Sequence, residues 1–335
     1  MLTNFYPISV KHLPVNRVGL LTQLVKVCKG INFKPSKQHT KPTTITHHSH
    51  LGQWTEIFNQ QLTGQRVSII TDNGDIKIYQ SGELGQLRLY GEMGLLHGGD
   101  LDMYFYTENW RDINHHQEKT TGSLICHDDS QHKAWQLRSS QLNKVLPYPS
   151  LSVSLPAQQQ VAAQQAKPTS VEINELRQMW ASLTQVHQFY DMLSVFKLGL
   201  LDAIKLMQGQ WTHPISNCQL TRFIQQCLEH NLNSKILAGN RGILHVLKTP
   251  ILYINQDSST LAVSGHHYSC EINLHAIKQV WLVKRATKQG VVHSLEAFDS
   301  HDRLIVQIQE QRDGNRAESD LWTRCLGRQG IIPMR

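Results

Sequence analysis

The sequence predicts an α+β protein made by tandem duplication, in which each half is a large antiparallel β-sheet with helices packed on one face. The first observation is an internal repeat, in which Trp110 aligns with Trp281. The second is that short alternating apolar segments, typical of strands, are separated by turn residues. The third is that helices precede the strands in each half instead of alternating with them, which argues against a parallel sheet.

The repeat extends well beyond one tryptophan. The segments that align at the same offset, first half then second, are 100–104 with 271–275, 123–124 with 294–295, Asp128 with Asp299, and 136–137 with 307–308. Upstream, Gly74 falls on Gly242 at a slightly smaller offset, so the halves differ by a short insertion. A unit of this length exceeds the roughly 20–50 residues of a solenoid repeat. Two like domains side by side form a pseudo-symmetric cleft, and such clefts are favoured ligand sites.

Length and charge set broad limits. A chain of 335 residues suits two domains. We place the first repeat at residues 1–143, a linker rich in Pro and Gln at 144–168, and the second repeat at 169–335. The net charge of +7 indicates either an anionic partner or a contribution to solubility. Because no dense block of Lys and Arg occurs, no nucleic-acid partner is expected, and a basic scaffold for nucleic acid is only a third alternative.

Cysteine usage and hydropathy favour a cytoplasmic protein. The six cysteines are scattered without a CxxC pair, as expected for reduced thiols. No secretory signal is visible, because the apolar stretch 18–27 is short and contains Gln23 and Lys26. No apolar run approaches the roughly 20 residues of a membrane-spanning helix, so we expect no membrane insertion.

The first half is predicted to begin irregularly. Within residues 1–50 we expect one amphipathic helix at 20–27 and a loop at 34–50, followed by a helix at 54–62. Strands follow at 67–70 and 76–79, joined by the turn Asp72-Asn73-Gly74, which is a typical hairpin signal. Further strands are expected around 86–90, 101–106 and 123–127.

The second half begins after the linker, whose prolines and glutamines favour an extended chain. Thr169-Ser170-Val171-Glu172 has the form of a capping box and predicts the start of a helix. Helices are predicted at 172–183, 185–196, 200–208 and 219–230. Strands are predicted at 236–238, 243–247, 251–255, 260–263, 268–275, 279–285, 291–298 and 303–309.

Several familiar site motifs are absent or uninformative. The sequence has no GxSxG, P-loop or GxGxxG pattern, which leaves hydrolase and kinase functions without support. Neighbouring histidines occur at 47–48, 115–116 and 266–267, but their spacing fits no zinc-ligand frame, so surface or turn roles are the better interpretation. Glu172 and Glu175 fall in a first helical turn, where the helix dipole favours acidic side chains.

His187 differs from the other histidines because it lies beside an apolar helix face. On the predicted helix, its neighbours are Tyr190 and Asp191, and Phe189 and Leu193 flank the same face. A neutral imidazole there could ligate iron while the apolar neighbours bury a flat macrocycle. The alternative is a hydrogen-bonded core histidine, which is the commoner role for a single His on such a face.

The late strands add polar groups of a complementary kind. Lys284-Arg285 ends one predicted strand, Gln307 lies on another, and Arg312 follows it. Arginine binds carboxylates bidentately, so these groups suit a ligand that carries carboxylates. Solvated turn charges are the alternative.

Six segments occur in the order found in one known family. They are VHQFY at 186–190, GNRG at 239–242, INLH at 272–275, VWLVKRAT at 280–287, HSLEAFD at 293–299 and QRDG at 311–314. Together they resemble the C-terminal half of the bacterial hemin-degrading, HemS-like proteins, over roughly residues 172–325. The first half resembles the first repeat of that family through 94–96, 100–102 and 123–124.

The resemblance implies a cytoplasmic protein of haem uptake and iron utilisation, which receives haem from an inner-membrane importer and traffics it. The cofactor that it implies is haem, iron protoporphyrin IX. His187 matches the axial ligand of the haem iron in the family. Arg285, Gln307 and Arg312 match positions that approach haem or its propionates.

Two positions depart from the family pattern. Leu200 stands where the family commonly has Arg after the ligand helix, and Tyr104 ends Asp102-Met103-Tyr104 where the family has Asp-Leu-Arg. Tyr104 could hydrogen-bond to haem or ligate ferric iron from the opposite side. Because fewer cationic groups weaken propionate pairing and alter oxygen activation, haem binding is the main hypothesis. The alternative is an enzyme that cleaves the haem ring oxidatively with an external electron donor and releases iron.

Overall fold

The computed structural model of this chain describes residues 55–333 except 57, 92, 118–119, 145–150, 153–169, 187, 249 and 313–315. The helix expected at 20–27 and the loop expected at 34–50 therefore lie outside the described residues, as does most of the linker. Among the helices of the described part, none is long and apolar enough to cross a membrane. The five cysteines of that part are all free thiols.

The first half is almost entirely β-structure after a short π-helical turn. Its elements are η2 (Phe58–Leu62), β1 (Arg66–Asp72), β2 (Ile76–Glu83), β3 (Gln86–Tyr90), β4 (Met93–His97), β5 (Asp102–Tyr106), η3 (Thr107–Asn109), β6 (Trp110–Gln117), β7 (Gly122–Asp128), β8 (Lys133–Ser139) and η4 (Gln141–Lys144). The short strand β9 (Leu151–Ser152) follows and pairs with β6, so part of the predicted linker belongs to a sheet edge.

The second half starts with helices and continues as strands, as predicted. Its elements are α3 (Ser170–Ala181), α4 (Gln188–Val195), α5 (Leu200–Leu206), β10 (Thr212–Ile215), α6 (Asn217–Glu229), β11 (Ser234–Gly239), β12 (Ile243–Leu247), β13 (Tyr253–Gln256), β14 (Thr260–Ser264), β15 (Tyr268–Asn273), β16 (Gln279–Thr287), β17 (Gly290–Phe298), β18 (Leu304–Glu310) and α7 (Asp320–Arg328). Strand β10 and helix α7 are additions that the sequence patterns did not predict.

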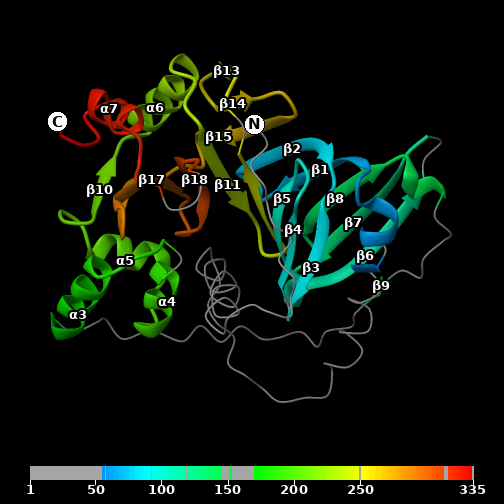
Figure 1. Cartoon of the computed structure of the whole chain (residues 1–335), viewed down its shortest axis with the longest axis horizontal. Helices are drawn as coiled ribbons and strands as arrows, with labels where there is room; N and C mark the ends of the chain where they lie inside the picture. Colours follow the sequence, from blue (N-terminus) through cyan, green and yellow to red (C-terminus); the bar gives the residue numbers. More distant parts are fainter. Residues whose placement is uncertain are drawn as a thin grey trace.

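The strands form two antiparallel nine-stranded sheets that exchange strands between the halves. Sheet A has the order β13-β14-β15-β2-β1-β8-β7-β6-β9, and sheet B has the order β10-β16-β17-β18-β11-β12-β5-β4-β3. Each sheet thus takes three consecutive strands from the other half, and these join through the pairs β15·β2 and β12·β5 (Figure 1). Reversing the order of sheet B matches it strand for strand with sheet A, so the duplication survives as pseudo-symmetry.

The sequence repeat is confirmed at the level of strands. Trp110 begins β6 and Trp281 lies near the start of β16, and these strands occupy equivalent places in the two sheets. The two side chains lie on different faces, because Trp110 belongs to the cluster between the sheets and Trp281 to the cluster with α3–α5. Asp128 accepts hydrogen bonds from the main-chain N–H groups two and four residues ahead, both at 2.9 Å. Asp299 makes the same two contacts at 2.8 Å. Asp128 and Asp299 therefore have the same local role in the two halves.

The two equivalent hairpin turns, one in each half, are joined by reciprocal hydrogen bonds. Asn73, between β1 and β2, donates from Nδ2 to the carbonyl of Gly239 at 2.9 Å. Asn240, between β11 and β12, donates from Nδ2 to the carbonyl of Asp72 at 3.0 Å. Each turn thus satisfies a main-chain acceptor of the other, as buried polar groups require.

The inner faces of the two sheets pack on each other and form two apolar clusters. One cluster joins Ile78 and Cys270 of sheet A to Ile236 and Leu295 of sheet B, together with side chains from α6 and α7. The second joins sheet A to β3–β5 and is closed by η2. The remaining helices, α3–α5, cover the opposite, outer face of sheet B (Figure 1).

His245 is an ionisable residue that lies between the two sheets. It is fully buried on β12 and contacts two side chains of sheet A. Its Nε2 lies 2.7 Å from Gln80 Oε1, and its Nδ1 lies 3.1 Å from Thr71 Oγ1. Since Gln80 Nε2 already donates to the carbonyl of Asp100, Gln80 Oε1 faces the imidazole as an acceptor. The geometry therefore favours the neutral tautomer with its proton on Nε2.

Burial lowers the pKa of His245 to about 3, because an imidazolium there would lose its hydration. A histidine in the unfolded chain has a pKa of about 6.5. Between these two values the unfolded state binds a proton that the folded state excludes. Stability from this residue is therefore complete above about pH 6.5 and falls as the pH is lowered toward about 3.

We predict that acidification from pH 7 to pH 5 lowers the free energy of unfolding by about 2 kcal/mol through His245 alone. The measurement is urea unfolding at several pH values, comparing the parent with His245→Gln. The variant is expected to be less stable at pH 7 and to show a shallower pH slope. The control His266→Gln changes an exposed imidazole and should keep the parent slope. An equal slope in the parent and His245→Gln would contradict the assignment.

Candidate functional site

The outer face of sheet B carries the candidate site. Helices α3, α4 and α5 pack on this face through a cluster that includes Trp180, Phe189, Leu193 and Ile204. The strand residues of the same cluster run from β16 across β18, β11 and β12 to β5. The apolar surface beneath the helices therefore crosses from the second half onto a strand that the first half contributes.

Helix α4 is held on the sheet by an aromatic stack over a buried cation. The guanidinium carbon of Arg285 lies 4.3 Å from the ring centre of Phe189 and 6.0 Å from that of Tyr190. Phe189 meets Trp180 edge to face at 4.6 Å, and Trp180 Nε1 donates to the carbonyl of Lys284 at 2.8 Å. Cation–π contacts are stronger when they are desolvated, as here. The first turn of α4 is therefore fixed directly above β16.

The positive charge of Arg285 is paired within the sheet. Its side chain is buried, and it donates to Glu296 Oε1 at 2.6 Å and to Ser294 Oγ at 2.5 Å. Burial opposes this charge, but Glu296 and Tyr190 outweigh burial and leave the pKa of Arg285 above its ordinary value. The sequence suggested that this arginine stands ready for an external carboxylate. The structure instead provides an internal carboxylate for it.

The predicted iron ligand, His187, lies outside the described residues. The residues on either side of it are tightly hydrogen-bonded. Gln188 Oε1 accepts from the main-chain N–H of Thr184 at 2.8 Å and from that of Gln185 at 3.1 Å. The N–H of Phe189 donates to the carbonyl of Val186 at 3.2 Å. The chain on both sides of position 187 is thus anchored, immediately before the first residue of α4.

Gln307 and Tyr104 share the outer face of sheet B, although they come from opposite halves. Side chains alternate between the faces of a strand, and directly paired residues share a face. Gln307 pairs with Leu237, and Tyr104 pairs with Leu244. Leu237 pairs in turn with Val246 on the neighbouring strand. The floor between Gln307 and Tyr104 is therefore made of Leu237, Leu244 and Val246, all of them buried.

The remaining sequence-predicted positions are not gathered on this face. Arg312 lies in the loop after β18, where its guanidinium donates to the carbonyl of Arg316 at 2.7 Å. Leu200 begins α5 and is buried in the cluster with the helices above the sheet. The structure thus places Arg285, Gln307 and Tyr104 on one face of sheet B, on strands β16, β18 and β5, and leaves Arg312 in the loop after β18.

Glu296 and Ser294 bind the buried arginine but were not among the predicted site residues. A signal for them exists in the pattern: both lie on one face of β17, and β17 pairs antiparallel with β16. When an arginine and an acidic residue lie on the same face of two adjacent, otherwise apolar strands, they indicate a buried ion pair. Lys284 and Arg285 are adjacent in the sequence, but their side chains lie on opposite faces of sheet B, because neighbouring strand residues point to opposite faces.

Comparisons with known proteins agree with the resemblance that the motifs indicated. Residues 197–328 match the family model of the haemin-degrading HemS/ChuX domain. A hemin transport protein, HmuS of Yersinia pestis, is 24% identical over 149 residues, which cover 44% of this chain and 43% of the relative. The aligned region thus spans less than half the length of this curated relative.

Solved structures share the duplicated two-sheet fold. The heme-binding protein PhuS of Pseudomonas aeruginosa, in its apo form, superposes with a TM-score of 0.72 at 20% identity and covers 81% of this chain and 83% of its own. The E. coli protein ChuS, described as a heme oxygenase, gives a TM-score of 0.70 at 18% identity and covers 95% of both chains. The duplicated fold is therefore that of the HemS-like proteins.

We predict that breaking the buried pair destabilises the protein far more than removing it. Glu296→Leu leaves the guanidinium without a counter-charge and should cost about 3–5 kcal/mol in the free energy of unfolding. The double variant Arg285→Met with Glu296→Leu should recover most of that loss. Urea unfolding of both single variants and the double variant measures the coupling.

A matched control is available on the surface. Lys205→Met removes the exposed ion pair with Asp302, which has an N···O distance of 3.5 Å, and should change stability by less than about 1 kcal/mol. Strictly additive effects of Arg285→Met and Glu296→Leu would show that the two charges do not stabilise each other.

Proposed function

We propose that this HemS-like chain binds haem on the outer face of sheet B, with His187 as the axial ligand of the iron. The observation that carries the proposal is the continuous apolar floor that runs from α4 to Tyr104, on a domain that matches the HemS/ChuX model. A porphyrin is flat and largely apolar, so it requires such a floor together with a few polar groups at its edges.

The residues present fit this ligand. Leu237, Leu244 and Val246 form a buried aliphatic row, and Gln307 lies at one end of this row with a side-chain amide. Tyr104 lies at the other end, half-buried against the same cluster. Its phenol could contact the ligand from the side opposite to α4. Haem supplies the iron chemistry, while the chain binds the ring and orients it.

Arg285 acts in this proposal as a positioning residue. Its guanidinium is committed to Glu296 and Ser294, and it supports Phe189, two positions after His187. Arg312 is left as the proposed partner of a propionate, because it lies at the rim of the sheet and is held only through a main-chain carbonyl among the described residues. An arginine at the rim can bind a carboxylate bidentately without a large desolvation cost.

The biological role that follows is haem handling in the cytoplasm during iron utilisation. The chain would receive haem from an inner-membrane importer and pass it on. Its relatives include a hemin transport protein and a structure described as a heme oxygenase, so carrying and cleavage are both represented among them. In this chain Leu200 stands where the family commonly has Arg, and it is packed into the core. This favours carrying over oxidative cleavage.

We predict that His187→Ala removes the iron-centred absorbance bands of the haem complex and weakens hemin binding at least tenfold. The measurement is an absorbance titration with hemin, with circular dichroism to confirm that the variant is folded. The control His266→Ala removes an exposed imidazole and should leave the spectrum unchanged. A parental spectrum in His187→Ala would overturn the ligand assignment and point to Tyr104 or His275.

A second prediction separates carrying from cleavage. When the haem complex is reduced with ascorbate in air, we expect its porphyrin absorbance band to persist and no iron to reach a ferrous chelator. Loss of the band together with iron release would establish the enzymatic alternative. Free hemin under the same conditions provides the baseline rate of uncatalysed bleaching.

A further inference from the structure

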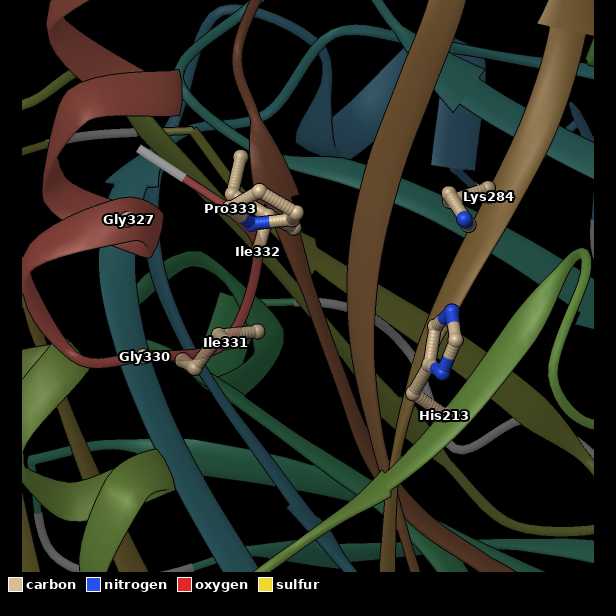
Figure 2. Close-up of a pocket in the computed structure, with 7 residues that line it drawn as sticks. All are labelled: His213, Lys284, Gly327, Gly330, Ile331, Ile332 and Pro333. Atoms are coloured by element: carbon tan, nitrogen blue, oxygen red, sulfur yellow. The ribbon is translucent and has the colours of Figure 1, made fainter. Parts of the chain in front are cut away.

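A cavity lies on the opposite side of β16 from the candidate haem face. Its volume is about 540 Å³, within the roughly 300–1,000 Å³ of small-molecule sites. His213 of β10 and Lys284 of β16 form one wall, and the segment from Gly327 to Pro333 forms the other (Figure 2). Because Lys284 precedes Arg285, its side chain points away from α4 and into this cavity.

The apolar wall is shaped by the way α7 ends. After the C-cap Gln329, Gly330 adopts φ +64°, a left-handed conformation that suits glycine. The N–H of Gly330 donates to the carbonyl of Gly327 at 2.8 Å, and the N–H of Ile331 donates to that of Leu326 at 3.0 Å. These two bonds form a Schellman motif, which turns the chain back across the sheet. They also satisfy two of the terminal carbonyls of the helix.

The polar wall consists of two basic groups without an acidic partner among the described residues. The carboxylate of Glu318, close to the neighbouring strand, is already bound by His293, which donates from its main-chain N–H at 2.7 Å and lies 2.6 Å away through Nδ1. His293 pairs with Lys284 across β16 and β17. The Glu318 carboxylate is therefore bound to the His293 imidazole. Within the described part of the chain, neither Lys284 nor His213 forms an ion pair.

The pKa values of Lys284 and His213 are both lowered, as expected for basic groups that have no neighbouring negative charge. Burial lowers the pKa of Lys284. Burial, followed by the neighbouring charge of Lys284, lowers the pKa of His213. Both effects would be relieved by an anion placed between the two side chains.

We propose that this cavity binds a small organic carboxylate, with its head group between Lys284 and His213 and its apolar chain against Ile331, Ile332 and Pro333. A carboxylate fits better than phosphate for two reasons. Among its described lining residues, the site presents two side-chain donors and no cluster of main-chain N–H groups of the kind that cradles phosphate. Its second wall is aliphatic, which favours a ligand that has an apolar body.

The test uses hexanoate as the probe and isothermal titration calorimetry on the full chain. Hexanoate is expected to bind in the millimolar range, as suits so small a ligand. Hexanol, which has the same chain without the charge, and inorganic phosphate, which has charge without the chain, are each expected to bind at least tenfold more weakly. Phosphate binding as tightly as hexanoate would overturn the choice of ligand class, and no hexanoate binding would overturn the site.

The variants locate the site. Lys284→Met should weaken hexanoate binding at least tenfold, and His213→Gln should weaken it several-fold. Lys278→Met is the matched control, because it removes the same charge from an exposed lysine that donates to the carbonyl of His275. Hexanoate affinity that is equal in Lys284→Met and Lys278→Met would place any binding elsewhere. Hemin titration of Lys284→Met should match the parent, because the two sites lie on opposite faces of β16.

Discussion

Each half contributes three strands to the sheet of the other half, so neither sheet is complete without both halves. A sheet edge exposes unpaired main-chain groups, and β12 and β2 would each be such an edge if the halves folded separately. The pairs β12·β5 and β15·β2 close both edges at once. Asn73 and Asn240 form reciprocal hydrogen bonds between the two hairpin turns. The buried His245 of sheet B contacts Thr71 and Gln80 of sheet A in the same region. The two repeats therefore form one structural unit with a shared core.

This exchange also has a functional consequence. Tyr104 belongs to the first repeat by sequence, yet it stands on the sheet that carries Gln307, Arg285 and α4. A site on the outer face of sheet B therefore needs residues from both repeats. The hydrogen bonds between β12 and β5 fix the position of Tyr104 relative to the strands of the second repeat. A flat ligand on this face would contact both halves without any hinge or domain closure.

The two repeats differ at the buried ion pair. Leu124 pairs with Leu137 as Leu295 pairs with Ile308, so Glu296 of β17 corresponds to Ile125 of β7. The first half thus has an apolar residue where the second half has the carboxylate that binds Arg285. A buried pair adds little net stability but is costly to break, because either partner alone is an uncompensated charge. Its retention in one repeat is consistent with a role in positioning rather than in folding.

The duplication, the antiparallel class and most strands could be predicted from the sequence, because a nearly constant offset between like residues and a strand period of two can be read along the chain. The sequence also indicated Arg285, Gln307 and Tyr104 as candidate site residues, although not their arrangement. The structure was needed to show which half supplies each strand, that Arg285 binds Glu296, and that Lys284 lines a different cavity. These features depend on hydrogen-bond pairing between segments far apart in the chain, and local patterns specify the face of a residue but not its partner.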